Sequence, residues 1–409
     1  MTMRVRAILM LMAALAMMGL AGCGHYTCSA EFGASTCSGG PTPPGGNTTA
    51  AFVYAVDPAG TIDGLTLNTS AATFTTTPNY TGPTGLPQDT PGQGMVVAQG
   101  QYLYALYGGV GEIYGFTIGS TGALTPMTNS PFSAAYLIDS TIGGAQAMIT
   151  NPAGTLLFVI DQSAGAVYTY QIGTGGALTL AANTPTFLPF EPENMATDGL
   201  GNFLYVTEIG TQVVPELAAY SITSSTGALT AVNGSPFSFG SFGMEQVQGE
   251  PSGLYLIGTT GSVTGDPHLY VFDIAQLGTA NAGAVTLASG SPFATPTGSS
   301  PVAIAVQPSA GGNIVYSFSV NISGTSYNPI EGYLLSTSGA LSVASNSPFT
   351  TLSSTGGWGQ FDQSGAYLFV FDSTTGLLSP FDVGTGGALT QPITTGAAIS
   401  GFWSPTDPN

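Results

Sequence analysis

Four polar side chains occupy the same place in successive repeats of the sequence, in a segment that ends in a turn. They are Gln93, Gln146, Glu193 and Glu245. Carboxylate and amide oxygens are ligands that Ca²⁺ prefers, and a bound ion can polarise a carbonyl and lower the pKa of its water. One hypothesis is therefore a metal-assisted hydrolase in which Glu193 and Glu245 bind Ca²⁺ and act in catalysis.

The same place is apolar or glycine in the other three repeats, which hold Val302, Gly357 and Ile399. Asn194 and Gln246 adjoin the polar residues, while Trp358 and Trp403 stand near the apolar ones. A polar arc that faces an aromatic side suits a small neutral polar ligand such as a sugar, and we expect these residues to contact it. The alternative is a water-filled channel whose polar residues only remain hydrated.

The repeat that positions these residues is about 50 residues long and contains one short strand of alternating aromatic and aliphatic residues. β-branched and aromatic residues bounded by turn residues are typical of strands. Its seven copies are Phe52–Val56, Tyr102–Leu106, Leu156–Ile160, Phe203–Val206, Leu254–Ile257, Ile314–Phe318 and Tyr367–Phe371.

Three further segments complete each repeat. A second strand follows the first, and then comes a Gly-Ala-Leu-Thr motif such as Gly122–Thr125. In five copies a Ser-Pro-Phe or Thr-Pro element begins eight residues beyond that glycine. Because proline cannot donate to a sheet ladder, we expect this element at a sheet edge, where it ends the outermost strand and places an aromatic ring between neighbouring sheets. The segment that carries Glu193 supplies the fourth strand.

Seven four-stranded repeats predict an all-β, seven-bladed β-propeller of antiparallel strands over residues 51–409. The two ends of this region support a closed ring. The segment Ala398–Pro405 resembles a first strand that lacks a second, whereas the first repeat begins with a second strand at Phe52. We expect the C-terminal strand to pair into the N-terminal blade, which leaves no open sheet edge.

The N-terminal residues predict export. Arg4 and Arg6 precede an apolar run that is too short to span a bilayer, as in a signal peptide. The segment Leu20–Cys23 resembles the lipobox of bacterial lipoproteins, which implies cleavage before Cys23 and a lipid on its sulfur. We expect a signal peptide at 1–22, a lipidated tether and Gly/Pro/Thr-rich linker at 23–50, and a location in the cell envelope. The alternative is an ordinary signal peptide with a chance cysteine.

Cys28 and Cys37 would then remain as a pair that forms a local disulfide in an oxidising compartment. The chain has only two basic residues, Arg4 and Arg6, against 21 acidic ones. The expected mature protein therefore has no Lys or Arg to neutralise phosphates, which excludes nucleic acid as a partner. We expect a monomer whose partners are the membrane, through Cys23, and a small neutral ligand or another protein.

The turn at Pro301–Gly311, the Leu-Tyr-Val strands and the motif Ser225–Phe237 resemble the seven-bladed lactonase propellers, a family with 6-phosphogluconolactonase-like and cycloisomerase-like members. The resemblance spans about Ala51–Pro405 and implies a ligand at the mouth of a central channel. The family acts on anionic lactones or carboxylates, and the resemblance implies Arg and His at the channel.

The sequence departs from that pattern, since its propeller has no Lys or Arg and a single histidine, His268. His268 lies at the start of a later strand of its repeat, and we expect it at the surface or in a turn. The sequence thus predicts a binding or interaction platform for a small neutral ligand or a protein partner. The alternative is the metal-assisted lactone hydrolase, with Ca²⁺ at the channel.

Overall fold

The structure, a computed structural model, describes residues 49–56, 61–68, 73–76, 86, 94–107, 111–133, 148–208, 216–239, 243–261, 265–308, 313–320, 328–352, 357–391, 396–399 and 403–406. The predicted signal peptide, the lipidation site Cys23 and the pair Cys28 and Cys37 lie outside the described residues, as do Gln93 and Gln146. Within these ranges, no helix is long and apolar enough to cross a membrane.

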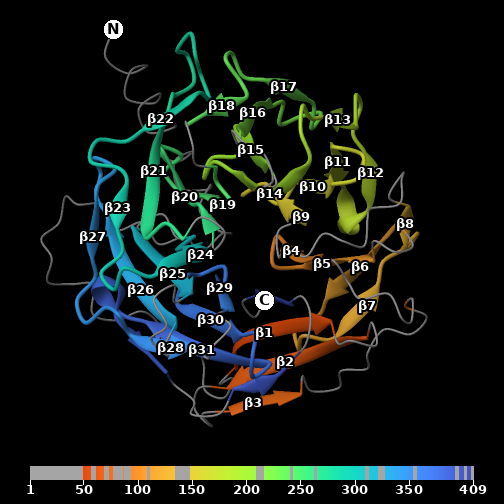
Figure 1. Cartoon of the computed structure of the whole chain (residues 1–409). Helices are drawn as coiled ribbons and strands as arrows, with labels where there is room; N and C mark the ends of the chain where they lie inside the picture. The colour runs from red at the N-terminus through yellow and green to blue at the C-terminus, as the bar shows by residue number, and fades with distance from the viewer. Residues whose placement is uncertain are drawn as a thin grey trace, which may run out of the picture. The chain divides into compact units, whose positions relative to one another are not determined.

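The strands between Thr49 and Thr406 form seven antiparallel sheets that surround a central axis as blades (Figure 1). The predicted all-β, seven-bladed β-propeller is therefore confirmed. In each blade four strands follow one another from the centre of the ring to its rim. In six blades a fifth short strand pairs with the third strand beside the fourth, so the outer edge consists of two pieces.

The strands divide among the blades as follows. Blade 1 contains β1 (Thr49–Val56), β2 (Ile62–Asn68), β3 (Thr73–Thr76) and β34 (Trp403–Thr406). Blade 2 contains β4 (Gly94–Ala98), β5 (Tyr102–Tyr107), β6 (Glu112–Ile118), β7 (Leu124–Pro126) and β8 (Phe132–Ser133). Blade 3 contains β9 (Met148–Thr150), β10 (Leu156–Asp161), β11 (Ala166–Ile172), β12 (Leu178–Leu180) and β13 (Thr186–Phe187). Blade 4 contains β14 (Pro192–Thr197), β15 (Phe203–Glu208), β16 (Glu216–Ile222), β17 (Leu229–Ala231) and β18 (Phe237–Ser238).

The remaining blades repeat this arrangement. Blade 5 contains β19 (Gln246–Gly249), β20 (Tyr255–Thr259), β21 (His268–Ile274), β22 (Val285–Leu287) and β23 (Phe293–Ala294). Blade 6 contains β24 (Ser300–Val306), β25 (Ile314–Val320), β26 (Asn328–Leu335), β27 (Leu341–Val343) and β28 (Thr350–Leu352). Blade 7 contains β29 (Gly357–Phe361), β30 (Tyr367–Asp372), β31 (Leu377–Val383), β32 (Leu389–Thr390) and β33 (Ala397–Ala398). Two 3₁₀ turns, η2 (Thr174–Gly176) and η3 (Thr385–Gly387), precede β12 and β32.

The C-terminal strand closes the ring as predicted. β34 pairs with β1, and its Trp403 lies opposite Ala55. The predicted start of this strand at Ala398 is wrong, because Ala397 and Ala398 form β33 and pair with β31 at the edge of blade 7. The chain thus completes the outer edge of its last blade before it crosses to the first, and Ile399 does not belong to an inner strand.

The Ser-Pro element marks the point where the outer edge changes from one piece to the other. In five blades the Ser or Thr hydroxyl accepts a hydrogen bond from a backbone N–H of the third strand. For example, Ser235 accepts from Ala219 at 2.9 Å, and Ser347 accepts from Gly332 at 3.0 Å. The hydroxyl thus gives a third-strand N–H its acceptor at the place where the two outer pieces separate. The motif therefore interrupts the outer strand, which continues after it, rather than ending it.

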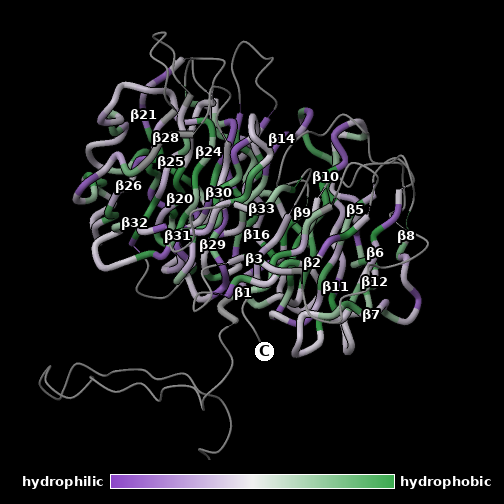
Figure 2. The backbone as a smooth tube through the Cα atoms, turned by 90° about the horizontal axis from the view of Figure 1, so that it is seen from below, coloured by the Kyte–Doolittle hydropathy of each residue, from purple (hydrophilic) through white to green (hydrophobic). Residues whose placement is uncertain are grey.

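The core lies between neighbouring blades. Every residue of β10 is buried, and the second strands of the other blades are similarly apolar on both faces. Both faces of a blade pack against another blade, so alternating aromatic and aliphatic side chains are buried on each side. Figure 2 shows the hydrophobic segments along the strands and hydrophilic ones mostly in the turns.

Candidate functional site

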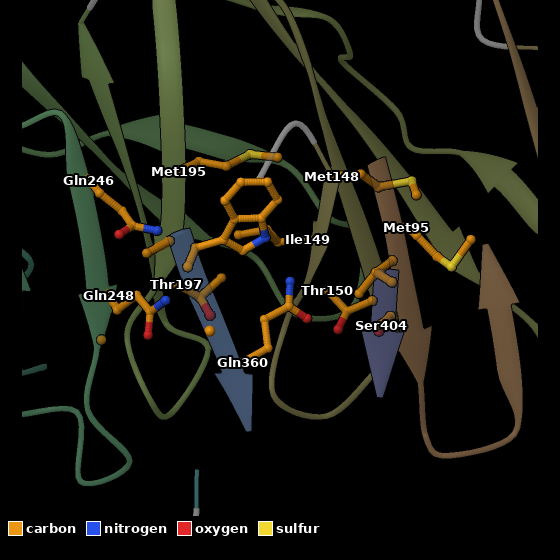
Figure 3. A pocket seen from close by; sticks show the side chains of 15 residues that line it. Met95, Met148, Ile149, Thr150, Met195, Thr197, Gln246, Gln248, Gln360 and Ser404 are labelled. Atoms are coloured by element: carbon orange, nitrogen blue, oxygen red, sulfur yellow. The ribbon is translucent and has the colours of Figure 1, made fainter. Parts of the chain in front are cut away.

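The inner strands of the blades enclose a cavity of about 290 Å³ at the centre of the ring (Figure 3). Strands β4, β9, β14, β19, β29 and β34 all contribute to its wall. The described lining residues are Met95, Val96, Met148, Ile149, Thr150, Met195, Ala196, Thr197, Gln246, Gln248, Gly249, Trp358, Gly359, Gln360 and Ser404. None of them is acidic or basic, so this part of the channel wall is neutral.

One part of the wall is polar. Figure 3 shows the amides of Gln248 and Gln360 grouped with the side chains of Thr150, Thr197 and Ser404, below the methionines in that view. The amide group offers both donors and acceptors, and a hydroxyl can act as either. The polar part of the wall can therefore pair with the hydroxyl groups of a ligand in more than one orientation.

Two of the glutamines that line the cavity, Gln246 and Gln248, already have partners in the next blade. The Gln248 amide donates to the carbonyl of Ile304 at 3.0 Å and accepts from the N–H of Val306 at 2.9 Å. The Gln246 oxygen accepts from the N–H of Ile304 at 2.6 Å. These side chains therefore link β19 to β24 through hydrogen bonds to the backbone of β24, as a neighbouring strand would. Within the described residues the Gln360 amide makes no such bond, so it is the glutamine most available to a ligand.

The other part of the wall is apolar. The thioether side chains of Met95, Met148 and Met195 line it, and Figure 3 shows Met148 and Met95 near each other and Met195 apart from them. Trp358 also lines the cavity, is half-buried and packs on Phe371 with ring centroids 4.8 Å apart. An aromatic ring held by such packing is a rigid surface on which the apolar face of a ligand ring can stack.

Of the residues that the sequence predicted to contact a ligand, Gln246 and Trp358 line this cavity. Asn194 is buried, and its backbone N–H donates to the Thr207 hydroxyl at 3.0 Å. Trp403 is buried between β1 and β29 and meets the Phe369 ring edge-on. In the described structure, neither Asn194 nor Trp403 is a lining residue.

The two predicted catalytic carboxylates lie at the start of neighbouring inner strands. Glu193 stands where the pairing of β14 shifts by one residue, between Pro192 and Asn194, and Glu245 directly precedes β19. The Thr207 hydroxyl joins the two strands, because it also donates to the carbonyl oxygen of Glu245 at 3.3 Å. Glu193 and Glu245 are therefore at one end of the channel, next to the described cavity lining rather than in it.

The predicted Ca²⁺ site requires six to eight oxygen donors around one point. In the ranges that the structure describes, no three Asp, Glu, His or Cys side chains lie close enough together to hold a metal ion. Two carboxylates alone are too few, and the amides of Gln93 and Gln146 lie outside the described residues. We therefore derive no reaction step through a metal ion here.

Sequence reasoning missed Gln248, Gln360, Thr150, Thr197 and Ser404. A signal for them was present, because side chains two residues apart share one face of a strand. Gln248 lies two residues after Gln246, and Gln360 lies two residues after Trp358. The sequence analysis took only the residues at the beginning of each inner strand. Including the residues further along each strand would have identified the cavity lining.

No family model matches the sequence, and no curated protein is similar enough in sequence to match it. Solved structures match the fold. A candidate 6-phosphogluconolactonase of Bacteroides fragilis gives a TM-score of 0.62 at 14% identity, covering 89% of this chain and 100% of that one. The periplasmic gluconolactonase of Pseudomonas aeruginosa gives 0.59 at 13% identity, covering 88% and 98%. The fold is that of the lactonase-like propellers.

A candidate 6-phosphogluconolactonase of Bacteroides uniformis has the same lactonase-like propeller fold, with a TM-score of 0.61 at 12% identity over 88% of this chain and 100% of that one. The resemblance predicted from sequence is thus confirmed for the architecture. At this level of identity the likeness concerns the fold alone, and the chemistry must be argued from the residues of the channel.

The single histidine of this lactonase-like propeller is held by an acid. Nδ1 of His268 lies 2.5 Å from Oδ1 of Asp266, and the Tyr270 hydroxyl donates to Oδ2 of the same carboxylate at 2.5 Å. Burial raises the pKa of the Tyr270 hydroxyl well above its usual value, and the hydrogen bond to Asp266 raises it further. His268 begins β21, is partly exposed and is not a lining residue of the described cavity.

Proposed function

We propose that the propeller binds a small, neutral, hydroxylated molecule in its central channel. The observation that carries this proposal is the composition of the cavity wall, which combines amides and hydroxyls with the ring of Trp358 and contains no charged side chain among its described residues. A cavity of about 290 Å³ is at the lower end of the usual range for small-molecule sites and suits a ligand of one sugar ring.

The charge of the chain narrows the ligand class. Beyond Arg6 the sequence has no Lys or Arg, so a phosphate or carboxylate in the channel would have no counter-charge from those side chains. A neutral ring needs no counter-charge. The periplasmic gluconolactonase with the same fold acts, by its name, on a gluconolactone, which is a neutral polyhydroxylated ring. We propose the same class of ligand, neutral polyhydroxylated rings without a phosphate, for this chain.

The test is a binding measurement by calorimetry or ligand-observed NMR with neutral sugars, neutral sugar lactones and their phosphorylated forms. We expect neutral ligands to bind and phosphorylated ones not to bind. Gln360→Ala and Trp358→Ala should each weaken binding about 10-fold, the value of one good hydrogen bond or ring contact. Gln162→Ala, in the turn between β10 and β11, is the matched control. Binding that both cavity variants leave unchanged would refute the site.

Hydrolysis of a neutral lactone is the second candidate. The observation in its favour is that the Thr207 hydroxyl bonds the backbone of Asn194 and of Glu245, so the strand starts that carry Glu193 and Glu245 lie side by side. A carboxylate there can take a proton from water as the water oxygen adds to the lactone carbonyl, and the proton then passes to the ring oxygen as the ring C–O bond breaks. The product is the open hydroxy acid.

We also propose that the protein is an exported monomer anchored in the cell envelope through a lipid on Cys23, with a disulfide between Cys28 and Cys37. The support is the sequence of residues 1–37 alone, namely the basic start, the apolar run and the lipobox-like segment. Metabolic labelling with a fatty acid should mark the protein, and Cys23→Ser should remove the label. Labelling that persists in Cys23→Ser would contradict the anchor.

A further inference from the structure

The two ends of the propeller differ in the side chains that they present. Neighbouring strands of a blade run antiparallel, so the turns from the first strand to the second and from the third to the fourth lie at one end, which we call the turn end. In blades 4 and 5 these turns are 198–202, 223–228, 250–254 and 275–284. The inner strands begin at the opposite end, where Glu193 and Glu245 lie.

The described turns of the turn end expose no charged side chain. They contain three acidic residues, all of them buried, namely Asp198, Glu250 and Asp362. Each carboxylate accepts backbone N–H groups next to it, as Asp198 does from Asn202 at 2.6 Å. Asp273 and Asp382 precede two of the turns, but they lie on β21 and β31 beside the outer strands. In a chain with 21 acidic residues, these turns therefore form a neutral surface.

Three leucines on this surface are exposed. The exposed fractions of Leu200, Leu254 and Leu277 are 58%, 40% and 62%. They belong to adjoining turns, because a Cβ added at Gly253 would collide with the Leu200 side chain, and the Gln276 amide donates to the Gly253 carbonyl at 3.0 Å. Single exposed leucines are common, whereas a group of them on a neutral surface is typical of a contact with a protein or a membrane.

The course of the chain favours a membrane. β1 is the second strand of blade 1, since it pairs with the inner strand β34 and the third strand β2, and its first residue, Thr49, therefore lies at the turn end. Cys23, the proposed lipid anchor, precedes Thr49 by 26 residues, which span at most about 90 Å. A lipid on Cys23 would thus tether the propeller by the end that carries the leucines, and a tether turns a weak contact into an intramolecular one.

We propose that the turn end rests on the lipid bilayer, with Leu200, Leu254 and Leu277 in its interfacial region. The leucine side chains lose contact with water there, while the carboxyls of the opposite end stay away from the negative surface of anionic lipids. The channel end at Glu193 and Glu245 then faces away from the membrane and is open to solutes. This inference rests on the proposed anchor at Cys23.

The experiment measures the quenching of tryptophan by lipid. The full lipidated chain is reconstituted in phosphatidylcholine vesicles with or without bromine on the acyl chains, and the parent gives the background of Trp358 and Trp403. The added emission of Leu200→Trp and of Leu277→Trp should be quenched at least two-fold by the brominated lipid. Phe187→Trp is the matched control, because Phe187 is 71% exposed and pairs with the start of β11 at the opposite end. Its emission should not change.

A second set of variants tests the leucines themselves, with Ala280→Trp in the turn 275–284 as the reporter. Its quenching should fall at least two-fold in the triple variant Leu200→Ser, Leu254→Ser, Leu277→Ser. The same reporter should be unaffected by Leu180→Ser, Leu287→Ser, Val343→Ser, which alters three exposed apolar residues on outer strands.

Flotation of the vesicles separates the contact from the anchor. A chain that floats with the vesicles but shows no quenching at Leu200→Trp and Leu277→Trp would overturn the contact and leave the anchor standing. Equal quenching at Phe187→Trp would overturn the orientation. A chain that does not float would refute the anchor and this inference with it, whereas ligand binding in the channel would be unaffected by that result.

Discussion

The hydroxyl of Tyr104 in blade 2 donates a hydrogen bond to the carbonyl oxygen of Gly176 in blade 3, at 2.6 Å. The same bond joins other neighbouring blades, namely Tyr54 with Gly122, Tyr205 with Gly283 and Tyr316 with Gly387. The glycine is that of the Gly-Ala-Leu-Thr motif, which reads Gly-Ala-Val-Thr at Gly283. The motif recurs because its turn presents a carbonyl to the buried tyrosine of the preceding blade, and so it fastens the blades to one another.

Tyr104→Phe should lower the free energy of unfolding by about 1–2 kcal/mol, because the carbonyl of Gly176 would lose its partner while the ring still packs. Phe158 occupies the equivalent place in blade 3 and shows that a ring without a hydroxyl fits there. Urea unfolding measures the change, and Tyr102→Phe at the same strand's partly exposed start is the control. An unfolding free energy within about 0.3 kcal/mol of the parent would contradict the role of this bond.

Gly175 and Gly176 offer a matched pair for the motif's turn. Both have positive φ, of 70° and 77°. A Cβ at Gly175 would meet nothing within 4 Å, whereas a Cβ at Gly176 would collide with the side chains of Met127 and Tyr102. Gly175→Ala should therefore lower the free energy of unfolding only through backbone strain, by about 1–2 kcal/mol. Gly176→Ala should lower it by about 1–3 kcal/mol more, because the added Cβ overpacks the site. Equal losses of unfolding free energy in the two variants would show that the close packing at Gly176 is unimportant.

Stability should be greatest in acid. Burial raises the pKa of Asp198, of Glu208 and of Asp382 above the usual values. Such a carboxyl favours the folded state while it is protonated, so its stabilisation is complete below the unfolded pKa, near 4, and is lost as the pH rises through the raised folded pKa. We expect Tm to fall between about pH 4 and pH 8, measured calorimetrically at constant ionic strength.

Glu208→Gln should flatten this dependence. The amide oxygen can still accept the N–H of Glu216, which the carboxylate accepts at 2.9 Å, but the group no longer titrates. Glu191→Gln, which changes an exposed carboxyl nearby, controls for the general effect of net charge. A Tm of the parent that climbs steadily from about pH 4 to pH 8 would show that raised carboxyl pKa values do not govern its stability.

The fold could be predicted from the sequence because each repeat contains residue types that determine the local structure at their own positions. Alternating aromatic strands, the motif glycine and the Ser-Pro edge each specify their own element, and β34 follows from counting strands. The cavity lining could not be predicted as well. The predicted positions lie at the starts of the inner strands, whereas the cavity is lined further along them, for example by Gln248 and Gln360, and the sequence does not show how far along each strand the lining extends.

His268 shows a second limit of sequence reasoning. Its sequence position at a strand start indicated a surface residue, and it is partly exposed. Its fixed orientation depends on Asp266, two residues earlier, and on the Tyr270 hydroxyl that holds the other carboxylate oxygen. Alternate residues of an extended segment can meet in this way, but the meeting depends on side-chain rotamers that no spacing rule specifies.

The double variant Glu193→Gln, Glu245→Gln separates the two candidate functions. Both substitutions keep the side-chain volume, so the contact of the Glu245 side chain with Gly261 and the strand ends at Thr207 are preserved. If the channel end hydrolyses a neutral lactone, loss of the general base should lower kcat by about 100-fold or more. Glu112→Gln, on the third strand of blade 2, β6, is the control.

Ligand binding should respond differently from hydrolysis, because the amide and hydroxyl lining of the cavity is separate from these carboxylates. We expect the double variant to bind neutral rings as the parent does, while Gln360→Ala weakens binding. Full lactone turnover in the double variant would exclude Glu193 and Glu245 as the base. Since a hydrolase must bind its lactone before water attacks, a parent that binds neutral rings without any turnover would leave the channel as a binding site only.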